Sequence, residues 1–112
     1  VTLTGLHSVA TSQAATCWIV GANGSFYASN AGSGSLTQVR SGAGGALTDL
    51  GNTATDPGSV DAAIGAHGHY LYAQTGANGI VDEFRVNGDG SLTEIGSVTV
   101  ANSIGGEGIV AV

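Results

Sequence analysis

Hydrophobic and polar residues alternate over short stretches of this chain, as they do in strands that bury one face. Over residues 80–86 (IVDEFRV), Ile80, Phe84 and Val86 fall on one side, whereas Glu83 and Arg85 fall on the other. This period of two predicts a β-strand. No part of the sequence sustains the 3.6-residue period of an amphipathic helix. We therefore predict an all-β fold.

The sequence contains an internal repeat, in which the same order of predicted strands and turns occurs twice. Residues 46–51 (ALTDLG) recur 45 positions later as residues 91–96 (SLTEIG), and residues 31–34 (AGSG) match residues 76–79 (GANG). Upstream, residues 21–24 match residues 65–68 at an offset of 44, which predicts one residue missing from the first copy near Ser25 and Phe26. A unit of about 45 residues lies in the range of a four-stranded β-propeller blade.

Each copy predicts four short antiparallel strands. They cover residues 17–20, 26–29, 35–40 and 47–51 in the first copy, and residues 61–65, 70–74, 80–86 and 92–98 in the second. Asn23-Gly24, Asn78-Gly79 and residues 87–90 (NGDG) supply turns that tolerate positive φ. The blades span residues 16–52 and 60–100, between an outer strand of a preceding blade (1–6) and an inner strand of a following blade (108–112). Residues 1–112 thus form a single propeller segment and an incomplete ring.

Several of these stretches are similar to a known family. Residues 15–18 (ATCW), 23–34 (NGSFYASNAGSG) and 88–93 (GDGSLT) resemble the late blades of lactonase-family seven-bladed propellers, which include 6-phosphogluconolactonase-like enzymes. The resemblance covers nearly the whole chain and implies the C-terminal two blades of such a ring. It also implies an active site spread over several blades around a central channel. The sequence departs from the family's usual Asp-Gly turn at Asn23-Gly24 and His67-Gly68.

The composition limits the classes of molecule that this protein could bind. The net charge is −6, and Arg40 and Arg85 are the only basic side chains apart from histidine, which argues against nucleic acid and anionic membranes. No apolar run approaches the roughly 20 residues of a membrane-spanning helix. Glycine and small polar residues in place of lysine favour a secreted or cell-surface protein, with the cytoplasm left open. The single cysteine, Cys17, leaves the redox compartment open.

The starts of the inner strands supply the candidate channel residues. Three such starts would direct the side chains of five residues towards one axis: Thr16, Cys17, Ser59, Asp61 and Glu107. Glu107 lies between two glycines, where it has little use in packing, so it is the first candidate for a channel acid. Asp61 and His7 are the other candidate catalytic residues. For Glu107 the alternative is a solvated carboxylate, and for Cys17 it is a buried structural thiol beside a packed Trp18.

Other motifs favour structural interpretations. His67 and His69 lack a third ligand, so we expect exposed turn residues and no metal site. Residues 87–90 lack the acidic pattern of a calcium loop, so we expect a tight turn. Arg40 and Arg85 are repeat-equivalent and predict surface or inter-blade ion pairs, with anion binding as the alternative. No cofactor motif is present.

Two hypotheses for function follow. Two blades alone would leave apolar sheet faces open, so we expect the ring to be completed by blades of another chain or by self-association. The chain would then be a structural or ligand-binding segment of a lactonase-like propeller. The alternative is a hydrolase or lactonising enzyme that acts on a lactone or sugar acid, a small-molecule ligand of the channel in the closed ring.

Overall fold

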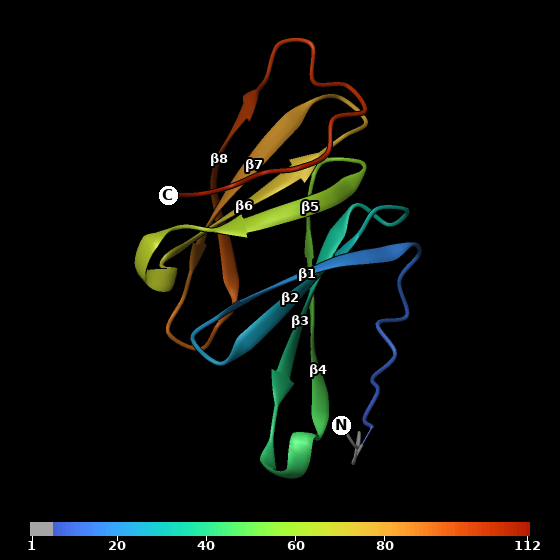
Figure 1. The fold of residues 1–112 in the computed structure, drawn as a ribbon, viewed down its shortest axis with the longest axis vertical. Helices are drawn as coiled ribbons and strands as arrows, with labels where there is room; N and C mark the ends of the chain where they lie inside the picture. The colour runs from blue at the N-terminus through green and yellow to red at the C-terminus, as the bar shows by residue number, and fades with distance from the viewer. Residues whose placement is uncertain (1–5) are drawn as a thin grey trace, which may run out of the picture.

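The computed structural model describes residues 6–112, which form two four-stranded antiparallel sheets (Figure 1). The first sheet holds β1 (Thr16–Ala22), β2 (Ser25–Asn30), β3 (Ser35–Ser41) and β4 (Leu47–Ala54). The second holds β5 (Ser59–Ile64), β6 (Tyr70–Thr75), β7 (Ile80–Val86) and β8 (Leu92–Thr99). All eight predicted strands are confirmed, with ends shifted by at most three residues. The predicted outer strand over residues 1–6 lies outside the described residues except for Leu6, which is exposed and not in a strand.

Within each sheet, consecutive strands are neighbours. The β1–β2 hairpin closes on Asn23 and Gly24, whose φ values are 51° and 79°, as a two-residue hairpin turn requires. The β3–β4 connection contains a single 3-10 turn, η1 (Ala43–Gly45), and the β5–β6 connection contains another, η2 (Ala66–Gly68). None of the helical segments among residues 6–112 is long and apolar enough to cross a bilayer.

The pairing corrects the predicted repeat alignment. Thr16 pairs with Asn30 in the first sheet, as Ser59 pairs with Thr75 in the second. The inner strands therefore correspond at an offset of 43 and the second strands at 45. The prediction of one missing residue near Ser25 was wrong. Two residues are missing, and they are missing from the hairpin loop, where residues 23–24 correspond to residues 66–69. Sequence similarity between the two Gly-Ala-x-Gly stretches concealed this difference.

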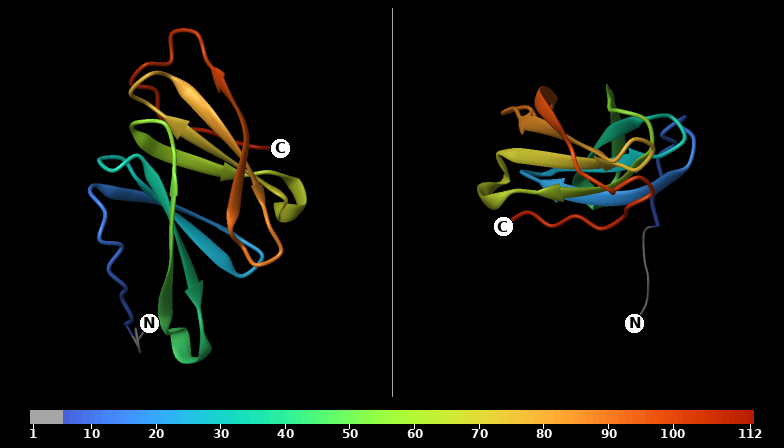
Figure 2. Two further views of the ribbon diagram at one scale, coloured as in Figure 1. Left: turned by 180° about the vertical axis from the view of Figure 1, so that it is seen from behind. Right: turned by 90° about the horizontal axis from the view of Figure 1, so that it is seen from above.

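We call the first sheet blade 1 and the second blade 2. They pack against each other through a hydrophobic cluster to which both contribute. Blade 1 supplies Ala22, Tyr27 and Leu36, and blade 2 supplies Ala62, Leu71, Ala73, Phe84 and Val86. The inner strands β1 and β5 lie next to each other, whereas the outer strands β4 and β8 lie toward opposite ends of the long axis (Figures 1 and 2). This is the arrangement of neighbouring propeller blades.

Each blade therefore has two faces. The leading face points toward the position of a preceding blade, and the trailing face toward that of a following blade. The trailing face of blade 1 carries Tyr27 and is buried against the leading face of blade 2, which carries Leu71 and Ala73. Among residues 6–112, no blade lies against the leading face of blade 1 or the trailing face of blade 2.

Residues 108–112 form no strand within the chain. They run beside β5 and in the same direction as β5 and β1 (Figure 1). The Ile109 N–H donates a hydrogen bond to Asp61 Oδ2 at 3.2 Å. This is the position of the next inner strand in the series, and their pairing in a following blade stays a prediction.

Candidate functional site

The starts of both inner strands carry a β-bulge. The register shifts between Thr16 and Trp18 in β1, and between Ser59 and Asp61 in β5, so that Cys17 and Val60 are the inserted residues. Bulges commonly redirect side chains next to functional sites. Cys17 is exposed, and its Sγ lies 3.6 Å from the carbonyl oxygen of Val60. The repeat thus places the same irregularity twice, side by side, at one end of the inner strands.

Asp61 is the best-connected candidate. The residue is 7% exposed, and its carboxylate accepts hydrogen bonds from two backbone groups, Ala62 N–H at 2.7 Å and Ile109 N–H at 3.2 Å. By strand pairing it corresponds to Trp18 of blade 1. In this chain Asp61 ties the C-terminal segment to β5, and both of its oxygens are engaged.

The two hydroxyl candidates differ in environment. Thr16 is exposed, and its Oγ1 donates to Asn30 Oδ1 at 2.6 Å. Ser59, at the equivalent position, is fully buried, and its Oγ has no hydrogen-bond partner within the described chain. Thr16, Cys17, Ser59 and Asp61 are therefore gathered at the strand starts, where Thr16 and Cys17 are exposed and Ser59 and Asp61 are buried.

Glu107 and His7 lie at different places. Glu107 is exposed in the C-terminal segment, two residues before Ile109 and hence near Asp61. His7 is exposed and lies against Gly45 of η1, with its Cδ2 3.3 Å from the position of a Cβ on that glycine. The η1 turn is at the far end of blade 1 (Figure 1), so the structure does not bring His7 together with Asp61 and Glu107.

The two histidines of η2 and its flank lie on the turn where the sequence predicts them. His67 and His69 are both exposed, and their ring centroids are 6.5 Å apart. Among residues 6–112 no group of three His, Cys, Asp or Glu side chains could hold a metal ion.

A set of inter-blade hydrogen bonds joins blade 1 to the β7–β8 turn of blade 2. The Tyr27 hydroxyl donates to the Gly90 carbonyl at 2.7 Å, and the Arg40 guanidinium donates to the Asp89 carbonyl at 2.7 Å. Gln38 Nε2 also donates to the Asp89 carbonyl, at 3.3 Å. We call Tyr27, Gln38 and Arg40 the turn clamp. Sequence reasoning missed Tyr27 and Gln38, although Tyr27 recurs as Tyr72 in the second repeat.

The turn that the clamp holds is preorganised by its own side chains. Asp89 Oδ1 accepts hydrogen bonds from the Ser91 N–H at 2.9 Å and hydroxyl at 2.7 Å, as in an Asx-type turn. These bonds from Ser91 lower the pKa of the Asp89 carboxyl. Burial raises the pKa of the Tyr27 hydroxyl, which therefore stays a donor. The tight turn predicted for residues 87–90 is confirmed, and Arg40 is bound to a carbonyl of that turn.

Asp82 is a second buried carboxyl. It is 1% exposed, its Oδ2 accepts the Asp56 N–H at 2.7 Å, and its Oδ1 has no partner within the described chain. Burial raises the pKa of Asp82, against the Asp56 N–H, which lowers it. The charge of Asp56 raises it further. The residue joins β7 to the segment that links the two blades.

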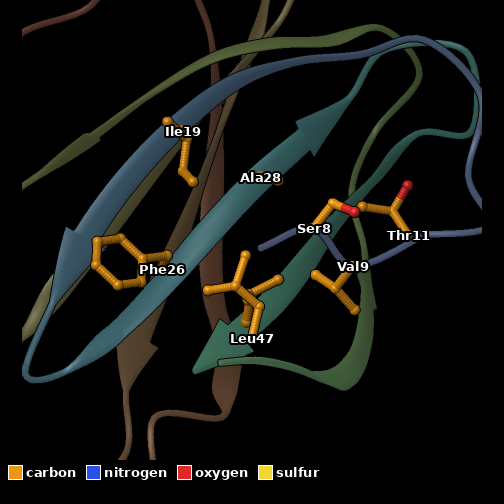
Figure 3. Close-up of a pocket in the computed structure, with 8 residues that line it drawn as sticks. Ser8, Val9, Thr11, Ile19, Phe26, Ala28 and Leu47 are labelled. Atoms are coloured by element: carbon orange, nitrogen blue, oxygen red, sulfur yellow. The ribbon is translucent and has the colours of Figure 1, made fainter. Parts of the chain in front are cut away.

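The leading face of blade 1 is hollowed. A pocket of about 380 Å³ is lined by apolar side chains of all four strands, with Ser8, Val9 and Thr11 of the preceding segment at its side (Figure 3). The strand residues are Ile19, Phe26, Ala28, Val39 and Leu47. Ile19 is 60% exposed and Phe26 39%. The strand residues that line this pocket are all apolar, and its polar side chains are those of Ser8 and Thr11 at its side.

Three solved structures share this arrangement. A protein of unknown function from Desulfotomaculum acetoxidans matches 85% of the chain with a TM-score of 0.74 and 16% identity. A Bacteroides fragilis protein, described as a proposed 6-phosphogluconolactonase, matches 72% with a TM-score of 0.66 and 22% identity. A Lactobacillus plantarum protein matches 76% with a TM-score of 0.63 and 13% identity. No protein-family model and no curated protein matches the sequence.

At these identities the likeness concerns the fold. It supports the predicted lactonase-like fold for the part of each structure that the chain matches. The chain spans 31%, 24% and 26% of the lengths of the three structures. The number of blades in a complete ring stays a prediction.

Proposed function

We propose that this chain is a structural or ligand-binding segment of a lactonase-like propeller, and that further blades complete it. The observation that carries the proposal is the open leading face of blade 1. Phe26, Ala28 and Val39 on that face correspond by strand pairing to Leu71, Ala73 and Phe84. Those three residues of blade 2 are fully buried, because blade 1 covers them.

The leading faces of blade 1 and blade 2 are both apolar, so both are stabilised by being covered. A sheet face with this apolar character is stabilised when it is removed from water, at about 25 cal/mol for each Å² of apolar surface. Among residues 6–112, blade 1 presents such a face with part of the segment before β1 against it. Its natural cover is the trailing face of another blade.

The experiment is a mass measurement on the particle isolated from its native source. Light scattering on a size-exclusion column gives the particle mass, and denaturing mass spectrometry gives the chains in it. We expect a particle well above the 10.9 kDa of this sequence, containing further blades. A native particle of this mass alone, with both faces open, would contradict the proposal.

Catalysis in a closed ring is the second candidate. The contact from Ile109 to Asp61 favours it, because it brings the segment of Glu107 to the bulged starts of the inner strands. Glu107 would act there as a general acid or base on a lactone or sugar-acid substrate. Lactone hydrolysis is measured for the native particle and for its Glu107→Gln variant. Turnover that the variant loses supports an enzyme, and no turnover in either contradicts it.

A further inference from the structure

We propose that the trailing face of blade 2 binds a following propeller blade whose outer turn, the turn between its third and fourth strands, is unlike the β7–β8 turn. That outer turn places a hydrogen-bond donor on Glu83 and stays back from Tyr70. The inference rests on the proposed function and adds the chemistry of the partner surface. The chain spans less than a third of each solved structure that it matches, so a further blade of the same fold is the natural cover for this face.

The contact between blade 1 and blade 2 is the template for this face. On the trailing face of blade 1, the turn clamp donates hydrogen bonds to the carbonyls of Asp89 and Gly90. Gly90 lies directly on Ser25, which is 1% exposed, and a Cβ on Gly90 would overlap Ser25 Oγ. Gln38 Nε2 also donates to Ser25 Oγ, at 3.1 Å. Blade 1 therefore presents donors and one small side chain to the outer turn of the next blade.

Strand register identifies the same positions on blade 2. Tyr72 pairs with Glu83, and Tyr70 pairs with Arg85, in the register that the clamp strands have in blade 1. The tyrosine and the arginine of the clamp are thus kept, and Arg85 is exposed. Glu83 takes the place of Gln38, and Tyr70 takes the place of the small serine. Two of the four positions therefore differ in the chemistry that they offer to a partner.

The change at Glu83 replaces a donor by an acceptor. An ionised carboxylate has acceptor oxygens only, whereas the amide of Gln38 donates to the Asp89 carbonyl at 3.3 Å. A carbonyl set against Glu83 would lie in the contact without a donor, which is unfavourable. A backbone N–H or a basic side chain would form a charge-assisted hydrogen bond there instead. The partner turn should therefore present a donor at this point.

The change at Tyr70 fills the room that the β7–β8 turn uses on blade 1. Tyr70 is 44% exposed on the open face. Between Gly90 and Ser25 there is no room even for a Cβ, so a turn seated as deeply would overlap a tyrosine ring. The outer turn of the following blade must therefore lie further from the sheet than the β7–β8 turn does.

The C-terminal segment makes the same kind of contact at the inner edge of this face. The Ile109 N–H donates to Asp61 Oδ2 at 3.2 Å, and residues 109–112 line a hollow of about 250 Å³ together with Tyr72. Asp61 stands where blade 1 has Trp18, so an acidic acceptor is again the difference between the blades. Because residues 109–112 lie in the place of the next inner strand, a carboxylate of blade 2 already accepts a donor from that position.

The test introduces Glu83→Gln and the repeat-equivalent Gln38→Glu, one at a time, into the native particle. Glu83→Gln should lower the melting temperature by about 2–4 °C, because a charge-assisted hydrogen bond becomes a poorer one. Gln38→Glu should lower it as well, because the Asp89 carbonyl then faces a carboxylate. The sign of the shift at Glu83 is decisive, since glutamine is the side chain that suits a carbonyl in the template.

Tyr70→Ser supplies a second measurement at the same contact. If the following blade packs on Tyr70, the substitution leaves a cavity and should lower the melting temperature of the native particle by several degrees, on the order of the shift for other large-to-small changes. Particle mass by light scattering shows that each variant is still assembled, and circular dichroism shows that it is folded.

Three results would overturn the inference. A melting temperature raised by Glu83→Gln would show that a carbonyl faces Glu83, as in the template. A melting temperature unchanged by Glu83→Gln, or not lowered by Tyr70→Ser, would show that no such turn lies there. Any of these in a particle that contains further blades leaves the proposed function standing, whereas a native particle of 10.9 kDa contradicts the proposed function itself.

Discussion

At the residue scale, the contact between the blades depends on a small number of polar groups within an apolar interface. Tyr27 is fully buried, and its hydroxyl reaches a backbone carbonyl that no strand pairs. A buried carbonyl that loses its donor costs more than the hydrogen bond itself contributed. The chain has a matched tyrosine at Tyr72, partly exposed, on the open face.

Tyr27→Phe is therefore expected to lower the free energy of unfolding by about 1–3 kcal/mol, because the Gly90 carbonyl stays buried without a donor. Tyr72→Phe, the repeat-equivalent change, should leave the stability of the monomer nearly unchanged. Urea unfolding at a concentration where the chain is monomeric measures both. Equal effects of the two substitutions would show that the Tyr27 bond does not stabilise the contact.

Asp82 gives the chain a pH dependence of stability. Burial raises its folded pKa above the ordinary value of 3.8, so the folded state holds its proton to a higher pH than the unfolded chain does. Between the two pKa values the folded state binds more protons, and stability falls as pH rises through this window. Asp82→Asn should remove that fall and stabilise the chain at neutral pH. Urea midpoints from pH 3 to pH 8 measure it, about the range over which carboxyls titrate.

Glu107→Gln, at an exposed carboxyl, is the control for the Asp82 change. Its pH profile should follow the wild type. An Asp82→Asn profile that keeps the full slope would assign the pH dependence to another group.

At the scale of the elements, alternation and turn chemistry account for the strands. The β7–β8 turn also joins the two blades, because side chains of blade 1 donate hydrogen bonds to its carbonyl groups. A Cβ on Gly90 would overlap Ser25 Oγ and Gln38 Nε2 of blade 1. Gly24 has a similar φ, 79° against 85°, but open space around it.

Gly90→Ala should therefore destabilise the chain by about 1–3 kcal/mol more than Gly24→Ala, since both strain the backbone and only Gly90 also overpacks the interface. Thermal unfolding of the two variants beside the wild type measures the difference. Equal melting temperatures for the two variants would mean that Ser25 and Gln38 of blade 1 move aside without a loss of stability.

At the scale of the whole molecule, two repeats with the same pattern have different burial. Leu71 is fully buried under blade 1, whereas Phe26, its equivalent, is 39% exposed on the open face. The neighbouring blade, and not the local sequence, makes this difference. Closing the ring would give the two positions the same environment.

Leu71→Ala should cost about 2–5 kcal/mol in the monomer, as in other buried sites. Phe26→Ala should cost clearly less, because much of its side chain is already in water. In an assembled particle the cost at Phe26 should rise toward that at Leu71. Urea unfolding at low and high protein concentration tests this. If assembly leaves the destabilisation by Phe26→Ala unchanged, then assembly does not cover Phe26.

The sequence by itself determined the eight strands, their turns and the two-sheet repeat, because period-two alternation and positive-φ turn residues act over a few neighbouring positions. It also placed Asp61 and Cys17 at strand starts. Only the tertiary structure decided which faces are covered, and which candidates come together. Tyr27 and Gly90 are 63 residues apart, and Arg40 and Asp89 are 49 apart. Local pattern carries no information about such partners, because they depend on how one blade is stacked on the next. For the same physical reason His7, which the sequence associated with Asp61, lies beside Gly45, while Ile109 reaches Asp61.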